Sequence, residues 1–119
     1  MRVIIAGSRT GVTLDDVYEA VDRANFPIST VISGTANGAD KFGEIWAFEN
    51  GIPVMRVPAD WDKFGRQAGI RRNCEMVLAA DALVAVWDGE SRGTAHIIEF
   101  AKSRGLKVFI HNVSKECVH

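Results

Sequence analysis

The sequence predicts a single Rossmann-like α/β domain, a five-stranded parallel sheet with helices on both faces and the element order βαβαβαβαβ. Two observations carry this prediction. Five short runs rich in Val and Ile recur along the chain with little polar alternation, which is typical of strands buried on both faces. Segments with helical periodicity separate these runs, and strict alternation of this kind indicates a parallel sheet with right-handed crossovers.

The apolar runs define the expected strands. Each run is short and is bounded by Gly, Pro or polar residues, as strand ends usually are. We expect strands at residues 2–7, 29–34, 52–58, 82–87 and 106–113.

The first two helices are expected at 13–24 and 38–50. Thr13 is a suitable N-cap for the first helix, because Asp16 follows three residues later and can complete a capping box. The apolar residues behind this cap recur at the helical spacing i, i+3, i+4 and i+7: Leu14, Val17, Tyr18 and Val21. The second helix should stop before Gly51, since glycine and the following proline end helices.

The third and fourth helices are expected at about 66–80 and 94–104. The apolar residues of the third helix predict one buried face, made of Ile70, Cys74, Val77 and Leu78. The fourth helix should end at Gly105, after a basic last turn, and should bury a stripe made of Ile97, Ile98 and Ala101.

Length and composition restrict the classes of function. The 119 residues fit one domain, expected at 1–113, followed by a short C-terminal tail at 114–119. The 14 basic and 15 acidic residues give a net charge of −1, which argues against duplex nucleic acid as a partner. No apolar run is long enough to span a membrane, and the first ten residues do not resemble a signal peptide. We therefore expect a cytoplasmic protein with no membrane partner.

The cysteines and histidines do not suggest a metal site. Cys74 and Cys117 form no C-x-x-C pair, and the three histidines, His96, His111 and His119, show no ligand-like spacing. We therefore expect no bound metal and no cofactor.

Polar, glycine-bearing loops follow four of the expected strands. They lie at 7–11, 33–40, 59–69 and 88–94. In an open parallel α/β sheet, ligands bind beyond the carboxyl ends of the strands, where the strand order reverses. The sequence therefore predicts that these loops meet at one binding edge.

The residues of these loops suit an anion such as phosphate. A helix N-terminus offers unpaired N–H groups, small residues let an anion approach the backbone, and Arg9 and Arg92 add forked donors. Each glycine, serine or threonine also has a purely structural explanation, as a turn or cap residue. Neither the G-x-G-x-x-G pattern of dinucleotide-binding folds nor the P-loop ending is present, so a dehydrogenase and a P-loop NTPase are not expected.

Taken in order, these loops resemble the YpsA-related branch of the SLOG superfamily. The resemblance rests on "GSR", "SGTANGAD", "ADW", "AGIRRNCEM" and "WDGESRGT", and it spans residues 2–113. It implies a Rossmann-like domain that binds nucleotides or nucleotide-derived ligands. Relatives include the Lonely-guy phosphoribohydrolases, the lysine-decarboxylase-like proteins and DNA-processing protein A, and they commonly assemble as dimers. A homo-oligomer is therefore expected, with the apolar "EIWAF" segment (44–48) as a candidate contact.

The resemblance also implies which residues bind the ligand. The residues carried over by position are Gly7, Ser8, Arg9, Gly34, Gly38, Ala39, Asp40, Arg72, Asn73, Gly89, Ser91, Arg92, Gly93 and Thr94. Thr35 and Asp88 join this set from their places in the same loops. Trp61, in the third loop, is placed either to stack on a base or to pack against the sheet edge.

One departure from the related hydrolases bears on function. Their "PGGxGTxxE" pattern has a glutamate three residues after the threonine, where this chain has Ile97. The nearest acid, Glu99, points about 200° away on a helix of 3.6 residues per turn. We therefore favour a sensing or sequestering module. The alternative is a small hydrolase of the N-glycosidic bond of a nucleotide, with Asp40, Asp88 or Glu99 as its acid.

Overall fold

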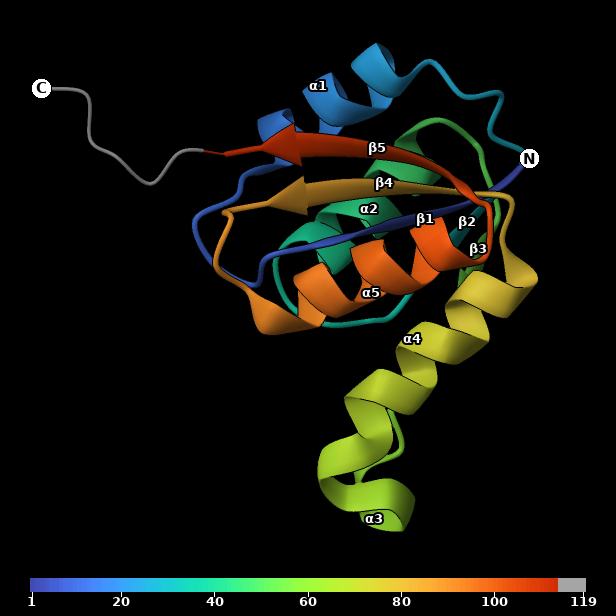
Figure 1. Cartoon of the computed structure of the whole chain (residues 1–119). Helices are drawn as coiled ribbons and strands as arrows, with labels where there is room; N and C mark the ends of the chain where they lie inside the picture. Colours follow the sequence, from blue (N-terminus) through green and yellow to red (C-terminus); the bar gives the residue numbers. More distant parts are fainter. Residues whose placement is uncertain (114–119) are drawn as a thin grey trace, which may run out of the picture.

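Five parallel strands form one sheet in the computed structural model, which describes residues 1–113 (Figure 1). The strands are β1 (Arg2–Gly7), β2 (Thr30–Ser33), β3 (Val54–Arg56), β4 (Ala82–Trp87) and β5 (Lys107–Asn112). Their order across the sheet is β3-β2-β1-β4-β5, so the order reverses between β1 and β4. The predicted α/β fold with a five-stranded parallel sheet is confirmed. The expected tail at 114–119 lies outside the described residues.

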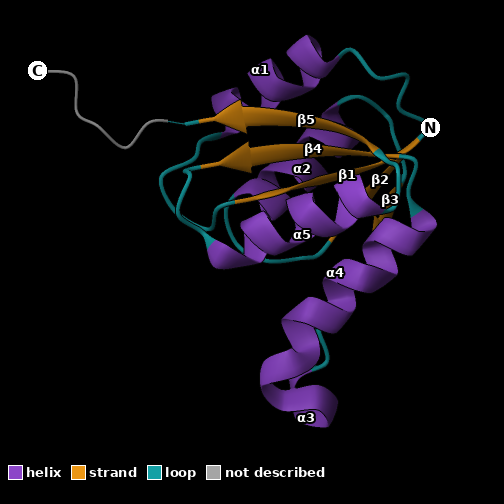
Figure 2. Ribbon diagram, in the orientation of Figure 1, coloured by secondary structure: helices purple, strands orange, loops and turns teal. Residues whose placement is uncertain are grey.

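Helices cover both faces of this sheet (Figure 2). The helical elements are α1 (Leu14–Ala24), α2 (Ala39–Glu49), α3 (Trp61–Phe64), the 3₁₀ turn η1 (Gly65–Gln67), α4 (Ala68–Ala79) and α5 (Arg92–Ser103). Helices α1 and α2 pack on one face, and α4 and α5 pack on the other. This arrangement is what strand–helix alternation with right-handed crossovers predicts.

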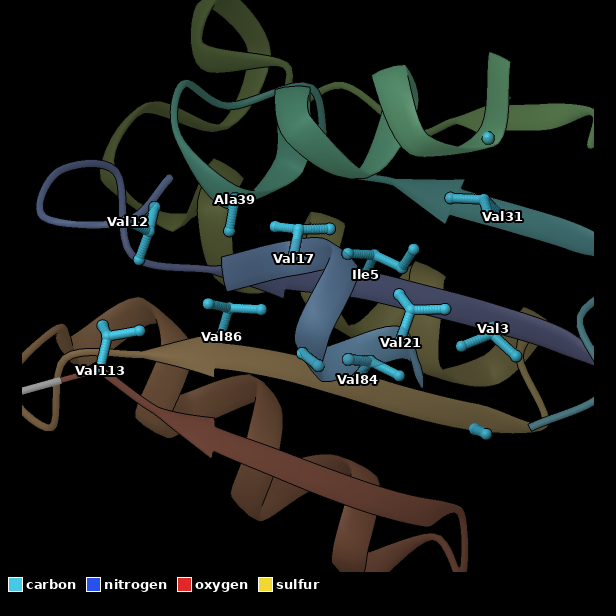
Figure 3. Packing of buried hydrophobic residues seen from close by; sticks show 13 residues of the cluster. Val3, Ile5, Val12, Val17, Val21, Val31, Ala39, Val84, Val86 and Val113 are labelled. Atoms are coloured by element: carbon cyan, nitrogen blue, oxygen red, sulfur yellow. The ribbon is translucent and has the colours of Figure 1, made fainter. Parts of the chain in front are cut away.

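The core is divided into two halves by the alternation of side chains along the strands. On β1, Val3 and Ile5 face α1 and α2, where they meet Val17 and Val21 (Figure 3). Ile4, the residue between them, faces α4 and α5. All three β1 side chains are fully buried, which explains why the strand has no polar alternation.

The start of α1 follows the predicted capping box. The N–H of Asp16 donates to Thr13 Oγ1 at 3.1 Å, and the N–H of Thr13 donates to Asp16 Oδ2 at 2.9 Å. The prediction of Thr13 as N-cap is therefore confirmed.

The segment after β3 differs from the expectation. Strand β3 spans three residues between Pro53 and Pro58, because proline has no N–H to donate to a sheet. The region expected as a loop at 59–69 forms α3 and η1, with Asp60 capping α3 through a 3.1 Å bond from the N–H of Lys63. Sequence reasoning missed this helix because it is only four residues long and too short to show a period.

The predicted buried face of α4 is wrong in part. Ile70 and Leu78 are 52% and 64% exposed, whereas Asn73 and Met76 are buried. Val77 is buried as expected. The physical reason is that the inner face of α4 borders both the core and a polar cavity, so a polar residue occupies a buried position and apolar periodicity misplaces the face.

Candidate functional site

A cavity of about 320 Å³ opens beyond the carboxyl ends of β1 and β4, where the strand order reverses. This is the place at which open α/β sheets bind their ligands. The wall comes from the end of β1 and the loop after it, the loop after β2 with the first turn of α2, the middle of α4, the loop after β4 and the start of α5. Its residues are Ala6, Gly7, Ser8, Arg9, Thr10, Ala36, Asp40, Arg72, Asn73, Met76, Asp88, Ser91, Gly93, Thr94 and Ile97.

The structure brings together most of the residues that the sequence singled out. The wall includes Gly7, Ser8, Arg9, Asp40, Arg72, Asn73, Asp88, Ser91, Gly93 and Thr94. The residues from the predicted set that do not line it are Gly34, Thr35, Gly38, Ala39, Gly89 and Arg92. Sequence reasoning did not propose Thr10, Ala36, Met76 or Ile97 as wall residues. Met76 and Ile97 lie at core-like helical positions, and only the meeting of α4 with α5 shows that they also face a cavity.

Two of the predicted glycines have structural reasons to be glycine. A Cβ at Gly7 would overlap the carbonyl oxygen of Val86 on the neighbouring strand β4. A Cβ at Gly38, whose φ is +78°, would overlap the carbonyl oxygens of Ser8 and Arg9. Gly7 therefore lets the end of β1 lie close to β4, and Gly38 lets the loop after β2 pack closely against the loop after β1. Gly7 lines the cavity, whereas Gly38 shapes it without lining it.

Asp40 is the buried carboxyl group of the site. It is 4% exposed, and its Oδ2 accepts a 3.1 Å hydrogen bond from the N–H of Ala36. Burial raises the pKa of Asp40 to about 6, against the lowering effects of the Ala36 hydrogen bond and of the Arg72 charge. Near neutral pH this carboxyl group is therefore close to its titration point.

Arg72 is the half-buried guanidinium of the site. Its Nη1 donates to the carbonyl oxygen of Gly34 at 2.5 Å, and its Nε donates to Asn73 Oδ1 at 3.2 Å. Burial lowers the pKa of Arg72, and the nearby Asp40 carboxylate opposes this shift. A guanidinium has five N–H donors, so the two bonds found among the described residues leave donors of Arg72 for an acceptor in the cavity. Arg9, exposed at the mouth, adds a second positive charge.

Gly34 lies between the Asp40 carboxyl group and the Arg72 guanidinium and leaves no space for a side chain. A Cβ at this position would lie 2.8 Å from Asp40 Oδ2 and 2.9 Å from Arg72 Nη1. Any larger residue would therefore push the carboxyl group and the guanidinium apart. Gly34 supports the site although it does not line the cavity.

Asn73 joins α4 to the first turn of α5. Its Nδ2 donates to the carbonyl oxygen of Gly93 at 3.2 Å and lies 3.3 Å from Nδ1 of His96, while its Oδ1 accepts from Arg72. These contacts use both the amide donors and the amide acceptor. The side chain therefore serves to position Arg72 and the start of α5.

The loop before α5 is held by its own polar groups. Asp88 Oδ1 accepts from the N–H groups of Glu90 and Ser91 at 2.8 and 2.9 Å. The N–H of Asp88 donates to Ser8 Oγ at 3.0 Å, which ties this loop to the loop after β1. The Asp88 carboxylate is thus engaged in shaping the loop.

Helix α5 starts two residues earlier than expected, at Arg92, with Ser91 as its N-cap. Ser91 Oγ accepts from the N–H of Thr94 at 3.5 Å and lies 3.1 Å from Thr94 Oγ1. The N–H groups of the first turn have no intrahelical partner, and Gly93 presents this turn to the cavity. This backbone carries partial positive charge and suits an anion.

Ile97 and Glu99 lie on different sides of α5. Ile97 is 2% exposed and forms part of the cavity wall, at the position where the related hydrolases have their glutamate. Glu99 is exposed and is not part of the wall. Of the three acids considered for a hydrolase, only Asp40 is a buried carboxyl group at the cavity.

The remaining features of the described residues concern metals and membranes. Within residues 1–113, no group of three or more His, Cys, Asp or Glu side chains is placed to hold a metal ion. None of the helices formed by these residues has the length and apolar character needed to cross a membrane.

Comparison with known proteins adds to this geometry. The chain is 36% identical over 117 residues to the Gene 61 protein of Mycobacterium phage D29. The aligned region covers 90% of this chain and 93% of that protein. The structure of DNA processing protein A from Streptococcus pneumoniae superimposes with a TM-score of 0.72 at 18% identity, over 92% of this chain. The chain spans 49% of the length of that protein, and at this identity the two proteins share the fold.

The family model that matches residues 1–64 describes the YspA, cpYpsA-related SLOG family. This match covers more than half of the chain, and the similarity to the phage protein extends over nearly all of it. Membership suggests, in general terms, a nucleotide-related ligand. The resemblance predicted from the loop motifs is confirmed, and the chain belongs to the YspA, cpYpsA-related SLOG family.

Proposed function

We propose that this protein is a cytoplasmic module that binds a nucleotide or nucleotide-derived ligand in the cavity at the carboxyl edge of the sheet and acts as a sensor or by sequestering the ligand. The observation that carries the proposal is Arg72, a half-buried guanidinium with unused donors, opposite the first turn of α5. A buried cation is stable when an anion pairs with it. The N–H groups of Arg92 and Gly93, which precede the capped Thr94 in the first turn of α5, offer the same anion a second contact.

The composition of the wall supports binding without hydrolysis. Ile97 occupies the place of the hydrolases' glutamate, and its hydrocarbon side chain can neither donate nor accept a proton. Asp88 is engaged by the backbone of its own loop, and Glu99 lies outside the wall. The cavity therefore provides contacts for a ligand but few groups for general acid–base chemistry.

Thermal denaturation in the presence of a nucleotide panel tests the proposal. The panel should include the nucleoside monophosphates, cyclic nucleotides and ADP-ribose. A ligand at a hundredfold over its Kd stabilises the fold by about 2.7 kcal/mol, which shifts Tm by on the order of 10 °C for a domain of this size. If no compound shifts Tm at millimolar concentration, the proposal is wrong.

One observation favours a second candidate, a hydrolase of the N-glycosidic bond of a nucleotide. Asp40 lines the cavity, and its raised pKa of about 6 suits a general acid near neutral pH. Chromatography of nucleoside monophosphates and ADP-ribose after incubation with the protein distinguishes the candidates. Release of free base over many turnovers, lost in Asp40→Asn, would establish the hydrolase, whereas the binding proposal expects intact ligand.

We also propose that the protein is a homo-oligomer. Helix α2 exposes Phe48 and Ile45, which are 85% and 41% exposed, in the segment that the sequence marked as a contact. A large exposed aromatic side chain of this kind is typical of interfaces.

A further inference from the structure

An arm of the protein extends beyond the sheet and carries an aromatic side chain that the core does not use. The arm consists of α3, η1 and the N-terminal half of α4 (Figure 1). Helix α3 packs on η1 and on α4. Trp61, at the start of α3, is 52% exposed and belongs to neither half of the core.

The indole of Trp61 lies against α4 close to Arg72. A Cβ at Gly69 would lie 3.5 Å from Trp61 Cη2 and 4.0 Å from Arg72 Nη2. The glycine leaves this part of the α4 surface flat, so that the indole rests on it. Trp61 and the guanidinium of the cavity are thus neighbours on the same helix surface.

This surface is the one that faces the cavity. Residues 69, 72, 73 and 76 follow the spacing i, i+3, i+4 and i+7, which places them on one face of a helix. Arg72, Asn73 and Met76 line the cavity. Trp61 therefore stands on the same side of α4, one helical turn, or about 5 Å, further out than Asn73.

Phe64, the second aromatic residue of α3, makes cation–π contacts with two basic side chains. The Arg71 guanidinium lies 4.2 Å from the centroid of the Phe64 ring, and Lys63 Nζ lies 5.2 Å from it. No ring or cation contact of this kind is found for Trp61 within residues 1–113. The indole thus lies beside α4 at Gly69, and about half of the Trp61 residue is exposed to solvent.

We infer that Trp61 is the stacking platform for the base of the ligand, so that the site takes a nucleotide with its phosphate against Arg72 and α5 and its base on the arm. This inference rests on the proposed function, because it assigns the outer part of the same ligand. Stacking tolerates any base, since every base has a π face. Stacking on Trp61 should therefore favour nucleotides over sugar phosphates more strongly than it favours one base over another.

Calorimetric titration with AMP and with ribose 5-phosphate tests the inference. The two probes share the sugar and the phosphate and differ in the base. We expect AMP to bind roughly tenfold or more tightly than ribose 5-phosphate, and Trp61→Ala to remove this difference while leaving ribose 5-phosphate unaffected. Trp61→Phe should keep most of it. Ile70→Ala is the matched control, because Ile70 is also 52% exposed on the arm but points away from the cavity face.

The possible outcomes separate the inference from the proposed function. If Trp61→Ala binds AMP as the wild type does, or if the wild type binds both probes equally, the stacking role is wrong while phosphate binding in the cavity stands. If neither probe binds and the nucleotide panel gives no Tm shift, both ideas fail. Circular dichroism monitors folding. Because Trp61 belongs to neither half of the core, the spectrum of Trp61→Ala should match that of the wild type.

Discussion

Gly93 offers the sharpest test of the proposed anion site. It lies at the second position of α5, lines the cavity and does not have a left-handed φ. A Cβ at Gly93 would meet no protein atom within 4 Å. The fold therefore gives no steric or conformational reason for glycine here, and the purely structural alternative, a left-handed turn, does not apply.

Replacement of Gly93 should consequently separate stability from binding. Glycine inside a helix is less stable than alanine by roughly 0.5–1 kcal/mol, so Gly93→Ala should leave Tm unchanged or raise it slightly. If a phosphate lies on the N–H groups of this turn, the bulkier Gly93→Val should exclude it. Loss of one charge-assisted hydrogen bond of about 1.5–3 kcal/mol weakens affinity tenfold to more than a hundredfold.

The measurement pairs thermal denaturation with calorimetric titration of the nucleotide that gives the largest Tm shift in the panel. Lys102→Val is the matched control, since Lys102 is exposed in the last turn of the same helix and lies outside the cavity wall. It should change neither affinity nor fold. If Gly93→Val keeps wild-type affinity, no anion contacts this turn and the reasoning is refuted.

Three other predictions concern the charged groups and the exposed aromatic. Arg72→Ala and Arg9→Ala should each weaken nucleotide binding tenfold to a hundredfold, with Arg71→Ala close to wild type; equal losses in titrations of all three would indicate general charge attraction instead. Because the folded-state pKa of Asp40 is raised from 3.8 to about 6, the folded state holds its proton longer, and the free energy of unfolding should fall by up to about 3 kcal/mol as pH rises from 4 to 7. Denaturant titrations at several pH values check this, and Asp40→Asn should flatten that part of the profile. Phe48→Ser should shift light-scattering mass toward the monomer while leaving the circular dichroism spectrum unchanged, because Phe48 is 85% exposed; an unchanged mass would exclude this contact.

The sheet and the place of the cavity could be predicted from the sequence because local patterns determine them. Val3, Ile4 and Ile5 are buried together, and an uninterrupted apolar run of this kind is what a strand covered on both faces requires. The loops after such strands necessarily share one edge, so Ser8 and Asp88 are brought together although they are 80 residues apart, and they are joined by a 3.0 Å hydrogen bond.

The arm and the buried face of α4 could not be predicted because they depend on contacts between distant elements. Asn73 is buried because the first turn of α5 lies over it and accepts its hydrogen bond through Gly93. Leu78 is 64% exposed, so no other element formed by residues 1–113 covers that side of the helix. Apolar periodicity places the polar Asn73 outside and the apolar Leu78 inside, the reverse of what the structure shows. Such a pattern cannot detect a cavity that replaces part of the core.

The glycines show the same limit in its sharpest form. Gly7, Gly38 and Gly93 are equivalent in the sequence, each a small residue in a loop or turn beyond a strand. In the fold, Gly7 and Gly38 are required by backbone oxygens that pass too close for a Cβ, whereas Gly93 faces open space. Steric need thus explains the first two without any ligand. No such steric need exists at Gly93. Gly93 lines the cavity, and Arg72, on the same cavity wall, has N–H donors that can bind a ligand there. The proposed ligand accounts for both observations at once, since the anion that pairs with the guanidinium also needs the bare backbone of α5.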